Sequence, residues 1–297
     1  MNDVISGLWV AVATPLDPAG AVDRDALVKH CQWLLANNCD GLALFGTTGE
    51  GPSFSASERL AAAEAVLQAG IPATQISLGT GCPAVPDTVA MTRGALALGL
   101  THALILPPYF FRDATEQGLE DAFAAVFDGV GSDRLRATLY HIPQVSGVAI
   151  PPGVLGRLRQ RYGKIMAGVK DSTVTGDLKN FKEFRAAAPE CGCVVGLEVD
   201  IWRSLQLGGT GSINGMSNVV PAMVRAMFND PDAEVTMRKA ATLLAGLPFA
   251  AAVKSALAAR TGDGAWRAVR PPLRPVDAAV GARIAAGLAE LGTHVAA

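Results

Sequence analysis

Short apolar runs recur along the whole chain and predict eight β-strands. Several of these runs are continuously apolar, whereas a strand with one face in water would alternate apolar and polar residues. Continuous runs are typical of parallel strands that are covered on both faces. The eight runs are residues 8–14, 41–46, 75–79, 103–107, 137–142, 165–170, 194–198 and 211–214.

Helical patterns lie between these runs. Residues 23–27 have the acidic start of a helix, and residues 55–58 fit a capping box before a run with helical spacing. Residues 116–130 and 177–188 are amphipathic, and Pro221 suits the first turn of a further helix. Strand–helix alternation repeated eight times predicts an α/β fold, the (β/α)8 TIM barrel, with a doubly wound open sheet as the alternative.

The chain from residue 232 onward reads as mainly helical and exceeds what the eighth barrel helix needs. We therefore predict additional C-terminal helices, with an Ala-rich run at residues 240–259 and a Pro-rich connection at 270–275. This predicts two parts: a barrel that carries the active site at residues 1–225 and a C-terminal helical extension at residues 226–297.

The composition is that of a folded chain with a sizeable core. Of the 297 residues, 50% are apolar and 18% are charged, which excludes general disorder. The net charge of −2 and the lack of a basic block exclude the usual footprint of nucleic-acid binding. Long uncharged stretches are interrupted by Gly, Pro and polar residues, so no membrane span is predicted. Five cysteines, an odd and small number, favour the reducing cytoplasm over a disulfide scaffold.

Only seven of the 25 cationic residues are lysines, and Lys170 is the one that ends a predicted strand. In barrels of this kind, functional residues gather at the C-terminal ends of the strands. Burial there favours the neutral amine over the ammonium ion, and a neutral amine can attack a ketone and form a Schiff base. The alternative is a lysine paired with Asp171 or Glu198 at the rim. Lys254 has mostly apolar neighbours on a predicted helix, and we expect it to be a surface residue that extends its amine into water.

The segment GTTGEG at residues 46–51 follows the second predicted strand. Its glycines permit a tight turn in which two hydroxyls and several backbone N–H groups face one point. Such a turn suits a carboxylate or a phosphate, and the alternative is an ordinary Gly-rich connection between a strand and a helix. Neither of the nucleotide-binding glycine patterns is present, so a nucleotide is not indicated.

Tyr140 lies near the end of the fifth predicted strand, where a phenol can relay a proton. The alternative is an aromatic residue of the core or the rim. His141 follows it and is a candidate base or metal ligand. The other histidines are scattered without metal-binding spacing, so no metal site is predicted. Cys191 and Cys193 have no second Cys or His pair nearby and are interpreted as structural.

Four short segments together resemble the dihydrodipicolinate synthase / N-acetylneuraminate lyase family of pyruvate-dependent class I aldolases. They are GTTGE at residues 46–50, LPPY at 106–109, YHIP at 140–143 and GVKDS at 168–172. They occur in family order at successive strand ends, and the resemblance covers residues 7–220. It implies a lyase, usually a homotetramer, that binds pyruvate and an aldehyde and needs no metal or organic cofactor.

The resemblance also implies roles for individual residues. Lys170 matches the lysine that forms the Schiff base, Tyr140 matches the tyrosine that shuttles protons, and Thr47 matches the hydroxyl that passes protons to that tyrosine. Thr48 matches the clamp for the pyruvate carboxylate. The remaining residues that we expect to bind substrate are Gly49, Ser172, Gly196, Glu198 and Ile213.

Two positions depart from the family pattern. The synthase branch has an arginine five residues after the strand-five tyrosine, which binds the carboxylate of aspartate semialdehyde, and this chain has Val145 there. The sugar-acid lyase branch has an apolar residue at this position. Glu198 matches a carboxylate that contacts sugar hydroxyls in sialic-acid lyases, although the next acidic position of that pattern is Val199 here, and a salt bridge at the rim is the alternative for Glu198. The usual second tyrosine after strand four is Phe110 here, so the proton relay is incomplete or water fills the gap.

We therefore expect an aldolase for a 2-keto-3-deoxy sugar acid. The alternative enzymes are 4-hydroxy-tetrahydrodipicolinate (dihydrodipicolinate) synthase and a keto-deoxy acid dehydratase, which would use the same Schiff base. A barrel that has lost catalysis and only binds a keto acid is the alternative from another class. Phe110 is the feature that favours this last alternative, and the presence of Lys170, Tyr140 and Thr47 together argues against it.

Overall fold

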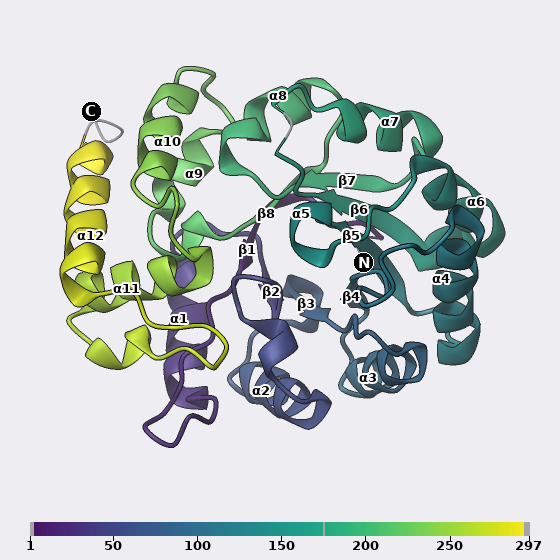
Figure 1. Cartoon of the computed structure of the whole chain (residues 1–297), viewed down its shortest axis with the longest axis horizontal. Coiled ribbons are helices and arrows are strands. Elements are labelled where there is room, and N and C mark those ends of the chain that lie inside the picture. Colours follow the sequence, from purple (N-terminus) through teal and green to yellow (C-terminus); the bar gives the residue numbers. More distant parts are fainter. Residues whose placement is uncertain (1–2, 175, 294–297) are drawn as a thin grey trace. The chain divides into compact units, whose positions relative to one another are not determined.

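The computed structural model describes residues 3–174 and 176–293. Within these residues, eight strands form a closed parallel barrel and follow one another around it in chain order (Figure 1). The fold is therefore the predicted (β/α)8 barrel, and the open-sheet alternative is wrong. The strands are β1 (Gly7–Ala11), β2 (Gly41–Leu44), β3 (Ile76–Gly79), β4 (His102–Ile105), β5 (Arg136–His141), β6 (Met166–Asp171), β7 (Gly192–Val195) and β8 (Gly211–Asn214).

Burial on both faces explains why the strands have continuously apolar sequences. Every residue of β2, β3, β4 and β7 is buried, although successive side chains of a strand point to opposite faces. A strand that is covered by helices on one face and by the barrel core on the other has no face for polar residues.

The α-helices of the described residues alternate with these strands and continue beyond the last one (Figure 1). They are α1 (Arg24–Ala36), α2 (Ala56–Gln68), α3 (Val85–Ala97), α4 (Glu116–Val130), α5 (Pro143–Ser146), α6 (Pro152–Tyr162), α7 (Lys179–Ala187), α8 (Ile201–Gln206), α9 (Pro221–Ala226), α10 (Ala233–Thr242), α11 (Phe249–Thr261) and α12 (Ala278–Thr293). The predicted C-terminal helices are confirmed as α10, α11 and α12.

The predicted helix starts are confirmed in their local chemistry. The Asp23 side chain accepts a hydrogen bond from the N–H of Ala26 and caps α1. Ser55 and Glu58 form the reciprocal capping box at the start of α2. Pro221 occupies the beginning of α9, where its missing N–H costs no hydrogen bond.

The chain divides into two compact units. Of the described residues, the first unit comprises 3–7, 72–174 and 176–213, and the second comprises 8–71 and 214–293. This division differs from the predicted one at residue 225, because residues 8–71 group with the C-terminal helices. The division into a barrel and a helical extension stays a prediction.

Each unit has its own helix packing. In the first unit, α3 packs against α4, α4 against α6, and α6 against α7, which covers the outer face of the strands between them (Figure 1). In the second unit, α12 lies alongside α11 and also contacts α10 (Figure 1). Across residues 3–174 and 176–293, no helix is both long enough and apolar enough to traverse a lipid bilayer.

A buried histidine fastens α1 to the core of the second unit. His30 Nε2 lies 2.9 Å from Asn218 Oδ1, and the same oxygen accepts the N–H of Ala13 at 3.0 Å. Because the amide oxygen is an acceptor, Nε2 of His30 carries the proton. The ring also packs edge-on against Trp266. Burial lowers the pKa of His30 from 6.5 to about 4, so the ring is neutral at neutral pH.

We expect His30→Gln to weaken the acid sensitivity of the fold. The folded-state pKa of His30 lies below the unfolded value, so the stability that depends on the neutral ring is present above pH 6.5 and is lost as the pH falls toward 4. Between pH 7 and pH 5 this amounts to about 2 kcal/mol. Urea unfolding at pH 7 and at pH 5 measures how much unfolding free energy each protein loses between the two pH values. This loss should be smaller for the variant than for the wild type. Equal losses in the two proteins would contradict the assignment.

Candidate active site

Lys170 and Tyr140 lie side by side on adjacent strands. They are register partners in the parallel pairing of β6 with β5, so their side chains leave the sheet on the same face. The Lys170 Nζ atom lies 4.1 Å from the centroid of the Tyr140 ring, and both residues are 3% exposed. The strand register therefore brings the predicted nucleophile and the predicted proton shuttle together.

The two neighbours in sequence face the opposite way. His141 and Asp171 are also register partners, and the ring of His141 packs edge-on against Phe184 of α7 with centroids 5.1 Å apart. Their face is therefore the helix-covered side of the sheet, and Lys170 with Tyr140 faces away from the helices. Asp171 accepts hydrogen bonds from the N–H and the hydroxyl of Thr173, at 3.0 and 2.8 Å.

The contacts of Lys170 bear on its two interpretations. The Lys170 Nζ atom forms no ion pair or hydrogen bond within the described residues, and its one polar partner there is the Tyr140 ring. Among the described residues, Lys170 forms neither of the two alternative salt bridges, with Asp171 or with Glu198. Burial raises the pKa of Asp171, and the nearby charge of Asp200 adds to this shift.

His141 holds a local turn. Its Nδ1 atom accepts the N–H of Ile150 at 3.0 Å, and burial lowers the pKa of the ring from 6.5 to about 4. Because the ring points toward α7, it cannot exchange a proton with a group beside Lys170. In the described part of the chain, no group of three or more His, Cys, Asp or Glu side chains is arranged to hold a metal ion.

Gly196 and Ser172 border the stem of Lys170. The N–H of Gly196 donates to the carbonyl oxygen of Asp171 at 2.8 Å, which holds the end of β7 against β6. A Cβ atom at position 196 would overlap the Ser172 hydroxyl and would lie 3.2 Å from Cε of Lys170. The close approach of three segments therefore requires glycine at this position.

Glu198 and Ile213 complete the predicted set in the first unit. Glu198 does not end a strand, because β7 stops at Val195 and Glu198 begins a short 3-10 helix, Glu198–Asp200. It is nevertheless buried, at 7% exposure, and Ile213 in β8 is fully buried. The predicted strand end at Glu198 is thus wrong, and both side chains are buried.

The predicted carboxylate clamp belongs to the second unit and forms a tight turn after β2. The N–H of Glu50 donates to the carbonyl oxygen of Thr47 at 3.1 Å, and the N–H of Gly51 donates to that of Gly46 at 3.0 Å. The Thr14 hydroxyl donates to the carbonyl oxygen of Gly49 at 2.8 Å. The turn is therefore closed on itself and held against the segment that follows β1.

Thr48 is the buried hydroxyl of this turn, whereas Thr47 is half-buried. The Thr48 Oγ1 atom packs on the backbone of Gly215, where a Cβ atom would lie 2.8 Å from it. Gly49 is also tightly packed, since a Cβ atom there would meet the carbonyl oxygen of Val12 at 2.5 Å. Their placement relative to Lys170 stays a prediction.

Lys254 is not a surface residue, contrary to the sequence-based expectation. Its side chain is 0% exposed, and its Nζ atom forms a 2.7 Å ion pair with Oε1 of Glu50, which is also 0% exposed. Helix α11 is covered over most of its length, and the run of small residues around Lys254 reflects burial on several sides. Sequence reasoning also missed Glu50 as the partner of Lys254. The one signal for this buried ion pair was an isolated lysine among alanines.

The connection between β4 and α4 brings a cation near Val145. Val145 is 60% exposed, and the Arg112 side chain lies over Gly147, where a Cβ atom would be 2.7 Å from Nε. Gly147 has a φ of +72°, which glycine adopts without strain. Phe110 and Phe111 are also exposed, at 76% and 65%. Exposed aromatic pairs are typical of association surfaces, and the predicted homotetramer stays a prediction.

Comparison with known proteins identifies the family. The profile of the Dihydrodipicolinate synthetase family matches residues 4–289. The chain therefore belongs to this family, whose members are class I pyruvate-dependent lyases.

Individual relatives resemble the chain over most of its length. An uncharacterized DapA-like lyase of Chloroflexus aurantiacus is 34% identical over 224 residues, which cover 75% of this chain and 74% of the relative. The 4-hydroxy-tetrahydrodipicolinate synthase 1 of Streptomyces coelicolor is 32% identical over 294 residues, 95% of this chain and 92% of its own. The crystal structure of dihydrodipicolinate synthase from Agrobacterium tumefaciens has a TM-score of 0.91 and 32% identity, and the match covers 97% of this chain and 99% of that one.

The crowding at Gly196 predicts the effect of a single methyl group. We expect Gly196→Ala to lower the free energy of unfolding by about 1–3 kcal/mol, because the new Cβ overlaps the Ser172 side chain. Adding Ser172→Ala removes the hydroxyl and should recover part of this loss. Gly264→Ala is the matched control, since a Cβ atom there has open space around it. A fully stable Gly196→Ala protein in urea unfolding would contradict the packing.

Proposed function

We propose that the protein is a class I aldolase or lyase that forms or breaks a carbon–carbon bond between pyruvate and an aldehyde, with Lys170 as the nucleophile. The observation that carries this proposal is the buried contact between Lys170 and Tyr140. The Nζ atom has no carboxylate partner among the described residues, and a phenol lies beside it. An amine without a counter-ion can attack a carbonyl carbon instead of being held as an ion pair.

The reaction follows from these two groups. The Nζ lone pair attacks C2 of pyruvate, the C2 oxygen leaves as water, and an iminium forms. In the condensation direction, the positive nitrogen accepts electrons when a C3 proton is lost, and the resulting enamine attacks the aldehyde carbon. In the cleavage direction, the C3–C4 bond of the keto acid's iminium breaks and gives the same enamine. Tyr140 gives or takes the proton at the aldehyde oxygen, and Thr47 exchanges protons with Tyr140. No further oxidant or reductant is required.

The carboxylate of pyruvate would be bound by the turn at residues 46–51. The N–H groups of Glu50 and Gly51 close the turn on itself, so the Thr48 hydroxyl and the N–H groups of Thr48 and Gly49 would be the donors to the anion. Ser172, Gly196 and Ile213 would line the pyruvate pocket, and the contact of Gly196 with the Lys170 stem supports this.

We propose a hydroxylated, uncharged aldehyde as the second substrate, so that the product is a 2-keto-3-deoxy sugar acid. Val145 offers no cation where the synthase branch has an arginine. A carboxylate beside this valine would find no hydrogen-bond donor in the side chain, although the valine itself is 60% exposed. The buried carboxylate of Glu198 would accept sugar hydroxyls and repel a second carboxylate.

The second candidate is 4-hydroxy-tetrahydrodipicolinate synthase, and Arg112 is the observation that favours it. The guanidinium lies over Gly147, two residues beyond Val145, and forms no ion pair or hydrogen bond within the described residues. Guanidinium groups bind carboxylates through two parallel hydrogen bonds. The relative from Streptomyces coelicolor also carries the name of this synthase.

We expect pyruvate plus borohydride to attach a reduced pyruvyl group to Lys170. Lys170→Arg should abolish the labelling, because a guanidinium keeps its proton and cannot attack the carbonyl. Lys254 should stay unlabelled, since its amine is buried in an ion pair. Peptide mapping by mass spectrometry checks both. An adduct on Lys254, or no adduct at all, would overturn the mechanism.

We expect kcat/KM for glyceraldehyde-type partners to exceed that for aspartate semialdehyde by at least about tenfold, which equals about 1.4 kcal/mol of transition-state binding. A side-by-side assay with pyruvate at saturation checks this, and Val145→Arg should narrow the difference. Equal or better turnover of aspartate semialdehyde would support the synthase. In that case Arg112→Gln should raise KM for aspartate semialdehyde and leave the half-saturating pyruvate concentration unchanged.

A further inference from the structure

Glu50 is held in a backbone conformation that it would not adopt alone. Its φ and ψ are 56° and 30°, the left-handed region that favours glycine, and it closes the turn that begins at Thr47. Gly51 follows, and a Cβ atom there would overlap the carbonyl oxygen of Phe45. Non-glycine residues persist in this region only where surrounding contacts hold them.

Both carboxylate oxygens of Glu50 have a partner from the C-terminal helical segment. Oε1 pairs with Nζ of Lys254 on α11 at 2.7 Å, and Oε2 accepts the backbone N–H of Arg270 at 3.0 Å. The side chains of Glu50 and Lys254 are both fully buried. The turn is thus fastened from outside at one carboxylate, through two directional contacts.

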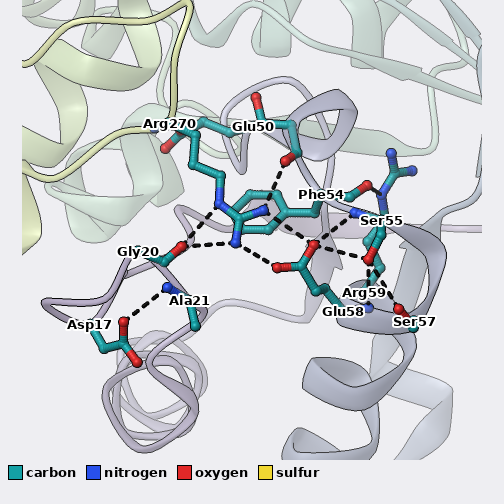
Figure 2. Close-up of polar contacts among 11 residues, drawn as sticks. Asp17, Gly20, Ala21, Glu50, Phe54, Ser55, Ser57, Glu58, Arg59 and Arg270 are labelled. Carbon is teal, nitrogen blue, oxygen red and sulfur yellow. Dashed lines mark hydrogen bonds and ion pairs between the residues drawn. The ribbon is translucent and has the colours of Figure 1, made fainter.

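Arg270 is itself fixed to the residues that follow the turn. Its guanidinium donates to the carbonyl oxygen of Ser53 at 2.9 Å and pairs with Oε1 of Glu58 at 2.5 Å. It also donates to the carbonyl oxygen of Gly20 and stacks on the Phe54 ring, with Cζ 4.3 Å from the centroid. Figure 2 shows this guanidinium between Gly20 and Glu58. The N–H that meets Glu50 therefore has a fixed position.

Stability alone does not require charges at this position. Ala252, Val253 and Leu257 around Lys254 are fully buried, and apolar residues of similar size commonly replace a buried ion pair without loss of stability. Burial lowers the pKa of Lys254, and the charge of Glu50 opposes that shift. Compared with an apolar contact, an ion pair also fixes the position of the carboxylate, because the carboxylate has to lie beside its cation.

We propose that Lys254 and Arg270 are positioning residues that act through Glu50. They hold the turn at residues 46–51 in the conformation in which Thr48 and the neighbouring N–H groups receive the carboxylate of pyruvate. The inference rests on the proposed function for the identity of the ligand. The geometry of the brace, which consists of Glu50, Lys254 and Arg270, does not depend on that function.

The test compares Lys254→Met with the double variant Lys254→Met/Glu50→Gln. The single variant leaves a buried carboxylate without its cation, so its thermal midpoint should fall. The double variant buries no lone charge and should regain most of that midpoint. Titration calorimetry should nevertheless give at least about a tenfold weaker pyruvate affinity for the double variant. In turnover, KM for pyruvate should rise by the same factor, while KM for the aldehyde stays within about twofold.

Hydrogen exchange supplies a readout that needs no substrate. The amides of residues 47–51 should exchange faster in the double variant than in the wild type, while amides of β5 and β6 keep their protection. The matched control is Arg225→Met/Asp40→Asn, which removes a 2.7 Å surface ion pair of the same unit and should change neither readout.

A stable double variant with wild-type pyruvate affinity and unchanged exchange at residues 47–51 would overturn the inference. Such a result would mean that the ion pair contributes only to packing. If instead the proposed function is wrong, borohydride will not label Lys170 in the wild-type protein. The faster hydrogen exchange of the double variant at residues 47–51 will still be observed. The two failures are therefore distinguishable in one set of proteins.

Discussion

The register between β5 and β6 is the constraint on which the candidate site depends. Because Tyr140 is opposite Lys170 and side chains alternate along a strand, the phenol and the amine share one face, and His141 with Asp171 shares the other. A shift of β6 by one residue would place the carboxylate of Asp171 on the face of Tyr140 and the amine of Lys170 on the face of His141, so amine and phenol would no longer share a face. The backbone hydrogen bonds of the sheet thus determine which chemistry is possible, before any side chain moves.

Close backbone approach is the second requirement, and glycines meet it. Gly196 lets β7 reach the stem of Lys170, and Gly49 lets the turn after β2 rest on the carbonyl oxygen of Val12. In both places a methyl group would separate segments that have to touch. The geometry of the candidate site therefore depends on the missing Cβ atoms of these glycines as much as on the reactive side chains.

The fold and the pairing of Lys170 with Tyr140 could be predicted because they follow from local patterns. Continuous apolar runs predicted the barrel, and Lys170 was recognisable as a lysine at a strand end. Lys254 was not, because its helix has the same small residues whether or not other segments cover it, and only tertiary packing decides its burial. Glu198 was placed on a strand for a related reason, since nothing in the sequence marks Val195 as the last paired residue.

Bond chemistry and substrate choice rest on different kinds of structure in this protein. Lys170 and Tyr140 come from strands, whose directions are fixed by hydrogen bonds to both neighbours. Val145 and Arg112 come from connections with exposed side chains, and the guanidinium reaches Gly147 from a different loop. A cation lost from one connection can therefore be replaced from another without any change at the strand ends. For this reason the residue at position 145 alone does not define the second substrate, whereas the proposed bond chemistry depends on the pair on β5 and β6.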